Sequence, residues 1–268
     1  MIDPQHPVSP AITSQIRHAD VVRALDALRA LRSSAMQIKE LGRSFEGRSI
    51  SVVTLGTGPA KVFAWSQMHG NEPTHTAALL DLISFLQRSP DHPTAHSILS
   101  GCTLELIVML NPDGAARYER RNAQGVDINR DALELQTPEG RILKQAIETI
   151  RPHFALNLHN QSQRACLGKQ PERVAAVSLL VPPIDPDDSQ TSEVEQAKQL
   201  AGCFVEATRP LCAEMTSRYH AGFMPRCFGE WVQGQKIPTL TIEAGGWTGP
   251  SIEHTPLVQI HFLGLMGI

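Results

Sequence analysis

The pattern of apolar and polar residues along the chain predicts an early hairpin followed by strands that alternate with helices. Between residues 19 and 32 apolar side chains recur every three or four positions, with arginines on the opposite face, which is typical of an amphipathic helix. Further helices are expected over residues 76–87, 139–150 and 193–208. Strands are expected within residues 36–56, which hold two, and within 61–70, 103–110, 154–159, 174–182 and 237–246. The proline-rich residues 89–96 are expected to form a loop.

This order of elements favours one α/β domain with a mixed sheet, because the chain shows neither internal repeats nor a low-complexity linker. We expect residues 1–35 to be an N-terminal segment of the same domain that residues 36–268 build. Ligands in such sheets bind beyond the carboxyl ends of strands, and His69, His159 and Glu243 all stand at predicted strand ends.

Composition narrows the classes of function and location. A net charge of -3 lacks the basic surplus that a nucleic-acid partner demands, and no run approaches the ~20 apolar residues of a membrane helix. The five cysteines are odd in number and form no CxxC pair, so we expect them to be reduced. The first ten residues hold an aspartate and three prolines in place of a basic start and an apolar run, which predicts a cytoplasmic protein.

Eleven histidines beside two tyrosines direct attention to metal chemistry. In His69-Gly70-Asn71-Glu72 the spacing brings an imidazole and a carboxylate to one side of a turn, as zinc requires, although an ordinary loop histidine is the alternative. His159 ends an apolar strand and would complete a His, Glu, His set, with a buried hydrogen-bonded histidine as its alternative. His92 and His96 are separated by a proline in the expected loop, which argues against a second metal site there.

Two other segments carry candidate chemistry. Residues 111–131 alternate arginines with amides after a buried strand, so they form either a solvated surface or a site for a planar carboxylate. Glu243 ends an apolar strand beside two glycines, where burying an unpaired charge costs several kcal/mol. A raised pKa at that position would suit a general acid or base.

In this order, the segments resemble the zinc carboxypeptidases of the carboxypeptidase A type, including shorter bacterial members that trim cell-wall peptides. The resemblance covers about residues 36 to 250 and rests on GRSFEGRSI, HGNE, NPDG, GVDINRD, NLH and TIEAGG. It implies a single α/β domain with a mixed sheet of about eight strands. It also implies one zinc ion per chain, held by His69, Glu72 and His159.

The resemblance further implies a role for five other residues. Asp127 matches the carboxylate that orients the first zinc histidine, and Arg120 matches the arginine that polarises the scissile carbonyl. Asn129 and Arg130 match the pair that holds the terminal carboxylate of the substrate, and Glu243 matches the general base. The implied reaction is hydrolysis of the C-terminal amide bond of a peptide or peptide-like substrate by a zinc- and glutamate-activated water.

The side-chain pocket is less closely matched. Tyr219, 24 residues before Glu243, matches the tyrosine of a mobile loop in the family. In the larger digestive enzymes a residue shortly after this tyrosine lines the base of the pocket, and Arg226 stands in that neighbourhood. We therefore hypothesise a preference for an acidic or carboxylate-bearing C-terminal residue, with a surface arginine as the alternative.

Two alternative functions stay open. Desuccinylases and aspartoacylases share HGNE, so the chain could be an N-acyl amino acid deacylase, although GRSFEGR and TIEAGG favour the peptidase. A non-catalytic module that binds a carboxylate is the other alternative, against which the presence of Glu243 and all three ligands argues.

Overall fold

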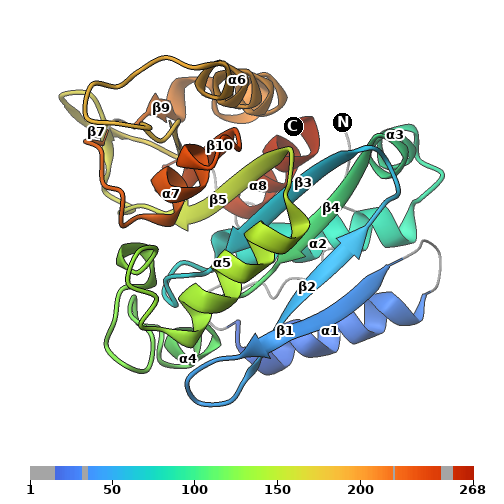
Figure 1. Cartoon of the computed structure of the whole chain (residues 1–268). Coiled ribbons are helices and arrows are strands. Elements are labelled where there is room, and N and C mark those ends of the chain that lie inside the picture. The colour runs from blue at the N-terminus through green and yellow to red at the C-terminus, as the bar shows by residue number, and fades with distance from the viewer. Residues whose placement is uncertain (1–15, 32–35, 220, 249–255) are drawn as a thin grey trace.

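An eight-stranded mixed sheet runs through the middle of the molecule (Figure 1), in the order β1, β2, β4, β3, β5, β10, β8, β9. The strands of this sheet are β1 (Gln37–Arg43), β2 (Ser49–Leu55), β3 (Ala60–Ser66), β4 (Cys102–Ile107), β5 (Phe154–Asn160), β8 (Val177–Leu180), β9 (Thr216–Arg218) and β10 (Thr239–Ala244). The structure is a computed structural model and describes residues 16–31, 36–219, 221–248 and 256–268. The expected α/β class and the mixed sheet of about eight strands are confirmed.

Strand direction changes three times across the sheet. β1, β2 and β4 pair antiparallel, whereas β4, β3, β5 and β10 run parallel to one another as neighbours. β8 pairs antiparallel with β10, and β9 runs parallel to β8 at the edge. A separate hairpin is formed by β6 (Cys166–Leu167) and β7 (Gln170–Val174). The parallel centre of the sheet therefore brings the carboxyl ends of β3, β5 and β10 to one edge.

Helices cover both faces of the sheet. They are α1 (His18–Ala30), α2 (Thr74–Arg88), α3 (Pro93–Gly101), α4 (Pro112–Arg117), α5 (Pro138–Ile150), α6 (Ser192–Cys212), α7 (Phe228–Gly234) and α8 (Pro256–Gly267). In Figure 1, α5 and α7 lie in front of the sheet, and α1, α2 and α8 lie behind it. Within the described residues, none of these helices has the length and apolar character that crossing a membrane requires.

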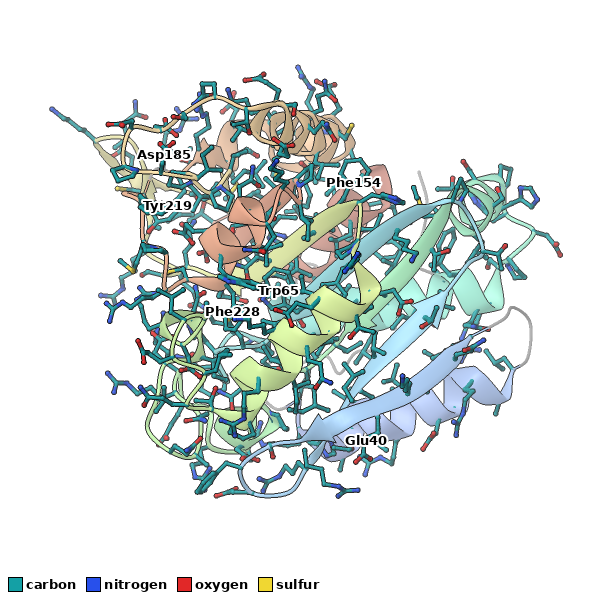
Figure 2. All side chains as sticks on the ribbon, viewed as in Figure 1. Glu40, Trp65, Phe154, Asp185, Tyr219 and Phe228 are labelled. Carbon is teal, nitrogen blue, oxygen red and sulfur yellow. The ribbon has the colours of Figure 1, made fainter. Side chains whose placement is uncertain are left out.

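Two hydrophobic cores result, one on each face. Along β3, Val62 and Ala64 pack into the core beneath α1, α2, α6 and α8. Phe63 and Trp65 point the other way, into the core beneath α5 and α7 that Phe228 also enters (Figure 2). Both faces of β3 are buried, and this explains its nearly continuous apolar sequence.

Most predicted elements match the observed ones within a few residues, but residues 89–96 do not. α3 begins inside this expected loop at Pro93, because a proline at the first helical position loses no intrahelical hydrogen bond. The ring Nδ1 of His92 accepts a hydrogen bond from the Thr94 N–H at 3.2 Å and caps the helix. The proline that indicated a loop thus starts a helix.

Differences also occur near the C-terminus of the chain. The strand expected over 174–182 is shorter, since β8 covers only Val177–Leu180. Neither α7 nor α8 was expected. α8 is apolar on nearly all sides because it packs against both α2 and α6, so it lacks the periodicity that marks a surface helix.

A buried histidine pair connects α8 to the start of α2. His75 Nε2 and His261 Nδ1 lie 2.9 Å apart, and both rings are fully buried. Burial lowers the pKa of His261 to about 4 and lowers the pKa of His75 well below its ordinary value. The pair is therefore uncharged at neutral pH and serves packing.

The α6–α8 contact yields a stability prediction. A Cβ at Gly264 would lie 2.2 Å from Cε2 of the buried Phe204 ring, so Gly264→Ala must displace that ring. We expect a loss of about 1–3 kcal/mol in the free energy of unfolding, measured by denaturant titration.

The matched control is Gly202→Ala on the exposed side of α6, where a Cβ meets nothing within 4 Å. This variant should gain about 0.5–1 kcal/mol, because alanine is the better helix former. Equal stabilities for the two variants would contradict the proposed packing.

Candidate active site

Three candidate residues stand at the carboxyl ends of neighbouring parallel strands. His69 follows β3 by three residues, and His159 and Glu243 lie near the ends of β5 and β10. His159 and Glu243 are direct partners in the ladder between those strands, so their side chains project from the same face. Parallel pairing thus gathers residues that are up to 174 positions apart in the chain.

The turn after β3 depends on a glycine. A Cβ at Gly70 would lie 2.0 Å from the carbonyl carbon of Gly114 and 2.3 Å from the Ala115 nitrogen, both in α4. Only glycine permits this approach of two backbones. The Gln67 side-chain amide donates to the Gly70 carbonyl at 2.9 Å, and Gln67 itself adopts a positive φ of 49°. This close packing presents His69 and Glu72 rigidly.

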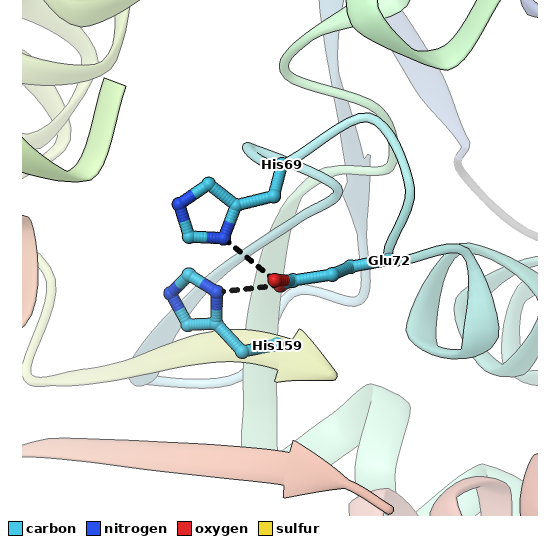
Figure 3. Close-up of side chains that lie close together, drawn as sticks. All are labelled: His69, Glu72 and His159. Atoms are coloured by element: carbon cyan, nitrogen blue, oxygen red, sulfur yellow. Dashed lines mark hydrogen bonds and ion pairs between the residues drawn. The ribbon is translucent and has the colours of Figure 1, made fainter. Parts of the chain in front are cut away.

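His69, Glu72 and His159 form a compact set of metal-binding donors (Figure 3). One candidate ligand atom from each lies within 4.8 Å of the others, and all three side chains are buried. The Glu72 carboxylate lies between the rings, with Oε1 2.8 Å from His69 Nδ1 and Oε2 2.8 Å from His159 Nδ1. Two imidazoles and a carboxylate are a donor set that suits zinc with an open position.

Asp127 supports the first imidazole from behind. Its Oδ1 lies 3.0 Å from His69 Nε2, and its Oδ2 accepts a hydrogen bond from Arg120 Nε at 3.0 Å. Burial alone would raise the pKa of Asp127, but His69 and Arg120 hold that pKa well below its ordinary value. An ionised Asp127 that accepts the Nε2 proton leaves the Nδ1 lone pair of His69 free for a metal.

The acidic groups of the site differ in their electrostatic surroundings. Burial opposes ionisation of Glu72, yet the adjacent His159 and His69 keep the pKa of Glu72 far below its ordinary value. Burial raises the pKa of Glu243, assisted by the nearby Glu72 carboxylate and only partly offset by His159. The buried Oε2 of Glu243 has no hydrogen-bond partner among the described residues. Glu243 therefore binds a proton more tightly than Glu72 or Asp127 does.

These residues open onto one cavity of about 350 Å³. Of the residues singled out from the sequence, those that line it are His69, Glu72, Arg120, Asn129, Arg130, His159, Tyr219 and Glu243. Tyr219 follows β9 directly and is 48% exposed, at the side of the molecule where Figure 2 labels it. The cavity thus joins the metal-binding donors to a pair of groups that suit a carboxylate.

The arginine-rich segment divides between surface and cavity. Arg117 pairs with Glu46, and Arg121 donates to the Gly125 carbonyl at 2.9 Å, so both hold loops together. Arg120 reaches the metal-binding donors, where its NH1 lies 3.2 Å from Glu72 Oε1. Some arginines of the segment thus belong to a solvated surface, whereas Arg120 belongs to the candidate site.

Asn129 and Arg130 lie on a short 3₁₀ turn, Ile128–Arg130, which Asp127 caps through the Asn129 N–H at 2.9 Å. The Asn129 Oδ1 accepts from the Phe228 N–H at 3.0 Å, which directs its oxygen toward α7 and leaves its NH₂ group available. Arg130 NH1 donates to the Asn129 carbonyl at 2.7 Å. Both side chains are thus fixed at the cavity by the local fold.

Arg226, which the sequence suggested for the side-chain pocket, is absent from the residues that line this cavity. Arg226 is exposed and does not line the cavity, because the turn before α7 directs its neighbour Cys227 inward instead. Its carbonyl accepts a hydrogen bond from the Ala132 N–H at 3.2 Å. The surface-arginine alternative is the one that the structure favours.

The lining residues that the sequence did not indicate include Asn157, Thr241 and Glu230. Asn157 and Thr241 stand two positions before His159 and Glu243 in their strands, so the period of two would have placed them on the same face. Glu230 enters from α7, which no sequence pattern had indicated.

Comparison with known proteins decides the family. A family model described as zinc carboxypeptidase matches residues 21–224, which is most of the chain. The chain belongs to the zinc carboxypeptidase family. The match includes His69, Glu72 and His159 and ends before Glu243.

Relatives and solved structures agree with that membership. Carboxypeptidase 2 of Trichophyton rubrum is 27% identical over 162 residues, which cover 56% of this chain and 30% of the relative. The chain thus spans about a third of the length of the curated relatives that it matches. A metallo-carboxypeptidase from Burkholderia cenocepacia superposes with a TM-score of 0.70 at 21% identity, over 92% of this chain and 68% of that one. One from Pseudomonas aeruginosa gives 0.72 at 20%, over 93% and 67%. These likenesses show the shared fold.

The donor set predicts metal binding that depends on Glu72. We expect the purified protein to hold one zinc ion per chain by elemental analysis. Glu72→Gln should weaken zinc affinity by more than the roughly 10–100-fold typical of changes behind the ligands, because a charged donor is lost. The control is His96→Ala, which changes an exposed histidine of α3 and should retain the metal. Stoichiometric zinc in Glu72→Gln at low free zinc would refute this site.

The raised pKa of Glu243 predicts a pH-dependent stability difference in metal-free protein. Below the ordinary glutamate pKa both the folded and unfolded states are protonated, so Glu243→Gln and wild type should differ least. As pH rises, Glu243 loses its proton in the unfolded state first, because its pKa is lower there. The free energy of unfolding of wild type therefore falls until the pH passes the raised pKa of the folded state.

The stability of Glu243→Gln relative to wild type should therefore increase between pH 4 and pH 8, measured by denaturant titration with a chelator. Glu148→Gln, at an exposed position of α5, is the matched control and should show no such increase. A difference for Glu243→Gln that is constant with pH would contradict the burial argument.

Proposed function

We propose that this chain is a zinc-dependent metallocarboxypeptidase that releases the C-terminal residue of peptides or peptide-like substrates. The observation that supports this proposal is the composition of one cavity. It is lined by the His69, Glu72 and His159 donors, by the unpartnered Glu243 carboxylate and by the Asn129 and Arg130 pair. Hydrolysis of a terminal amide needs all three components within reach of one substrate.

The metal would be held by Nδ1 of His69, the Glu72 carboxylate and Nδ1 of His159. Bound zinc supplies Lewis acidity there and lowers the pKa of a coordinated water toward neutrality. Asp127 fixes the orientation of the His69 ring by accepting its Nε2 proton. The 2.8 Å contacts of Glu72 with Nδ1 of both rings support this choice of donor atoms.

Glu243 is proposed as the general base. Its unpartnered Oε2 accepts the proton of the attacking water and later delivers it to the leaving amine. The raised pKa makes Glu243 a better proton acceptor than an ordinary carboxylate, because burial disfavours its charge.

Arg120, Asn129 and Arg130 are proposed to bind the scissile carbonyl and the terminal carboxylate of the substrate. The Arg120 guanidinium, beside the metal-binding donors, stabilises the oxyanion that develops from the scissile carbonyl, an effect typically worth about 3–4 kcal/mol. Arg130 and the Asn129 NH₂ group hold the terminal carboxylate, which limits cleavage to chain ends. Tyr219, at the exposed edge of the cavity, covers the bound residue.

The family supports this proposal over the two alternatives. The matching family is that of zinc carboxypeptidases. The Pseudomonas aeruginosa structure is a complex with (2-guanidinoethylmercapto)succinic acid, a carboxylic acid, which is consistent with a carboxylate site in this fold. The products of one assay distinguish the carboxypeptidase reaction from deacylation of N-acyl amino acids and from non-catalytic carboxylate binding.

That assay compares wild type with Glu243→Gln on a mixed peptide library, with products identified by mass spectrometry and zinc content measured in parallel. We expect wild type to release single C-terminal residues, and Glu243→Gln to lose about 10²–10⁴-fold in rate while it keeps its zinc, because proton transfer is lost. Glu148→Gln should match wild type. Stoichiometric zinc without loss of C-terminal residues would refute the carboxypeptidase proposal, and release of acyl groups only would identify a deacylase.

A further inference from the structure

Arg130 lines the cavity as a cation that no acidic side chain of the described residues neutralises. Its NH1 donates to the Asn129 carbonyl at 2.7 Å and to Cys227 Sγ at 3.1 Å, and both of these acceptors are uncharged. Glu230 lines the same cavity and makes no ion pair with Arg130, and burial raises the pKa of Glu230. Arg130 therefore keeps its charge for a ligand.

The two contacts of NH1 leave one defined edge of the guanidinium free. NH1 carries two N–H groups, and the protein supplies one acceptor for each of them. The Nε and NH2 atoms of Arg130 have no acceptor among the described residues. These two atoms present parallel N–H groups, the geometry in which a guanidinium holds a carboxylate by two hydrogen bonds. The partners of NH1 thus decide which edge of Arg130 stays free.

The main chain at the start of α7 holds the Cys227 thiol in place. The Cys227 N–H donates to the Met224 carbonyl at 2.9 Å, and its own carbonyl accepts from the Trp231 N–H at 2.9 Å. The next N–H, of Phe228, donates to Asn129 Oδ1 at 3.0 Å. That hydrogen bond ties together the two segments that supply the acceptors for NH1, so the positions of these acceptors are fixed relative to each other.

The acceptor that Cys227 provides is buried and uncharged. Cys227 is 7% exposed, and burial raises the pKa of its thiol to about 12, so the thiol is protonated at neutral pH. A protonated thiol accepts a hydrogen bond weakly and leaves the charge of Arg130 uncompensated. A carboxylate at this place would form an ion pair with Arg130 and compete with the substrate, and an aliphatic side chain would leave one N–H of NH1 without an acceptor.

We propose that Cys227 is a positioning residue for Arg130. With the Asn129 carbonyl it occupies both N–H groups of NH1, and it thereby directs the Nε–NH2 edge of Arg130 toward the terminal carboxylate of the substrate. This inference rests on the proposed carboxypeptidase function and deepens it, because it assigns the orientation of the group that recognises the chain end. Cys227 acts through Arg130, so its effect falls on carboxylate binding and not on the chemical step.

The test compares two variants of the zinc-loaded full chain, Cys227→Ala, which removes the acceptor, and Cys227→Ser, which restores one. With a peptide that ends in a free carboxylate, we expect Cys227→Ala to raise KM about tenfold while kcat stays within about threefold of wild type. Cys227→Ser should recover most of the wild-type KM. Cys203→Ala, which removes an exposed thiol of α6, is the matched control and should leave both constants unchanged.

A second measurement is independent of catalysis. By calorimetry on the zinc-loaded proteins, Cys227→Ala should bind 4-methylpentanoate about tenfold more weakly than wild type and Cys227→Ser do, because the carboxylate loses a correctly oriented partner. The neutral amide of the same acid should bind equally to all three proteins.

Two outcomes would overturn the positioning role and leave the carboxypeptidase function standing. One is an unchanged KM in Cys227→Ala, and the other is an equal increase in KM in Cys227→Ala and Cys227→Ser, which would indicate a packing effect. Absence of peptide hydrolysis by wild type would overturn the carboxypeptidase function, and the binding of 4-methylpentanoate would then still decide whether Cys227 orients Arg130 toward a carboxylate.

Discussion

Parallel pairing of β3, β5 and β10 is the constraint on which the candidate site depends. Neighbouring parallel strands end at the same edge of a sheet, so residues that follow or end them converge regardless of their separation in sequence. Here the convergence brings together two imidazoles and two carboxylates, with His159 and Glu243 in direct register. If one of these strands ran in the opposite direction, its end would lie at the far edge and the donor set would be incomplete.

Several carboxylates are buried at this site, and each has different neighbours. These neighbours determine which carboxylates stay ionised and which bind a proton more readily. Glu72 lies between two imidazoles and Asp127 contacts both His69 and Arg120, so both stay ionised. Glu243 and Glu230 are buried and have no ion-pair partner among the described residues, and burial raises their pKa values. Carboxyl groups thus provide a metal donor, an orienting acceptor and a candidate base, because the surroundings of each group set its charge.

The loops at this edge are rigid because they are tied to distant parts of the chain. Gly70 packs against the backbone of α4, and Asn129 accepts a hydrogen bond from the first residue of α7. Such ties fix side chains to the accuracy that catalysis demands, since small displacements cost much of the rate. They also explain why neighbouring arginines in one segment can have unrelated roles.

The sequence by itself determined the features that local chemistry encodes. Apolar periodicity located most helices and strands, and the spacing of His69 and Glu72, together with strand-terminal His159, indicated the metal-binding donor set. Proximity along the chain suggested Arg226 for the pocket and a loop around Pro93, whereas Arg226 is exposed outside the cavity lining and Pro93 begins α3. Local signals carry no information on which way a turn directs its side chains.

Only the tertiary structure decided part of the cavity lining and the last helices. Asn157 and Thr241 meet because β5 and β10 are in register, and Glu230 joins them because α7 packs across those strands. α8 is apolar all round because α2 and α6 enclose it, so its sequence shows no face. These properties arise from contacts between segments far apart in the chain, and a pattern within one segment cannot specify them.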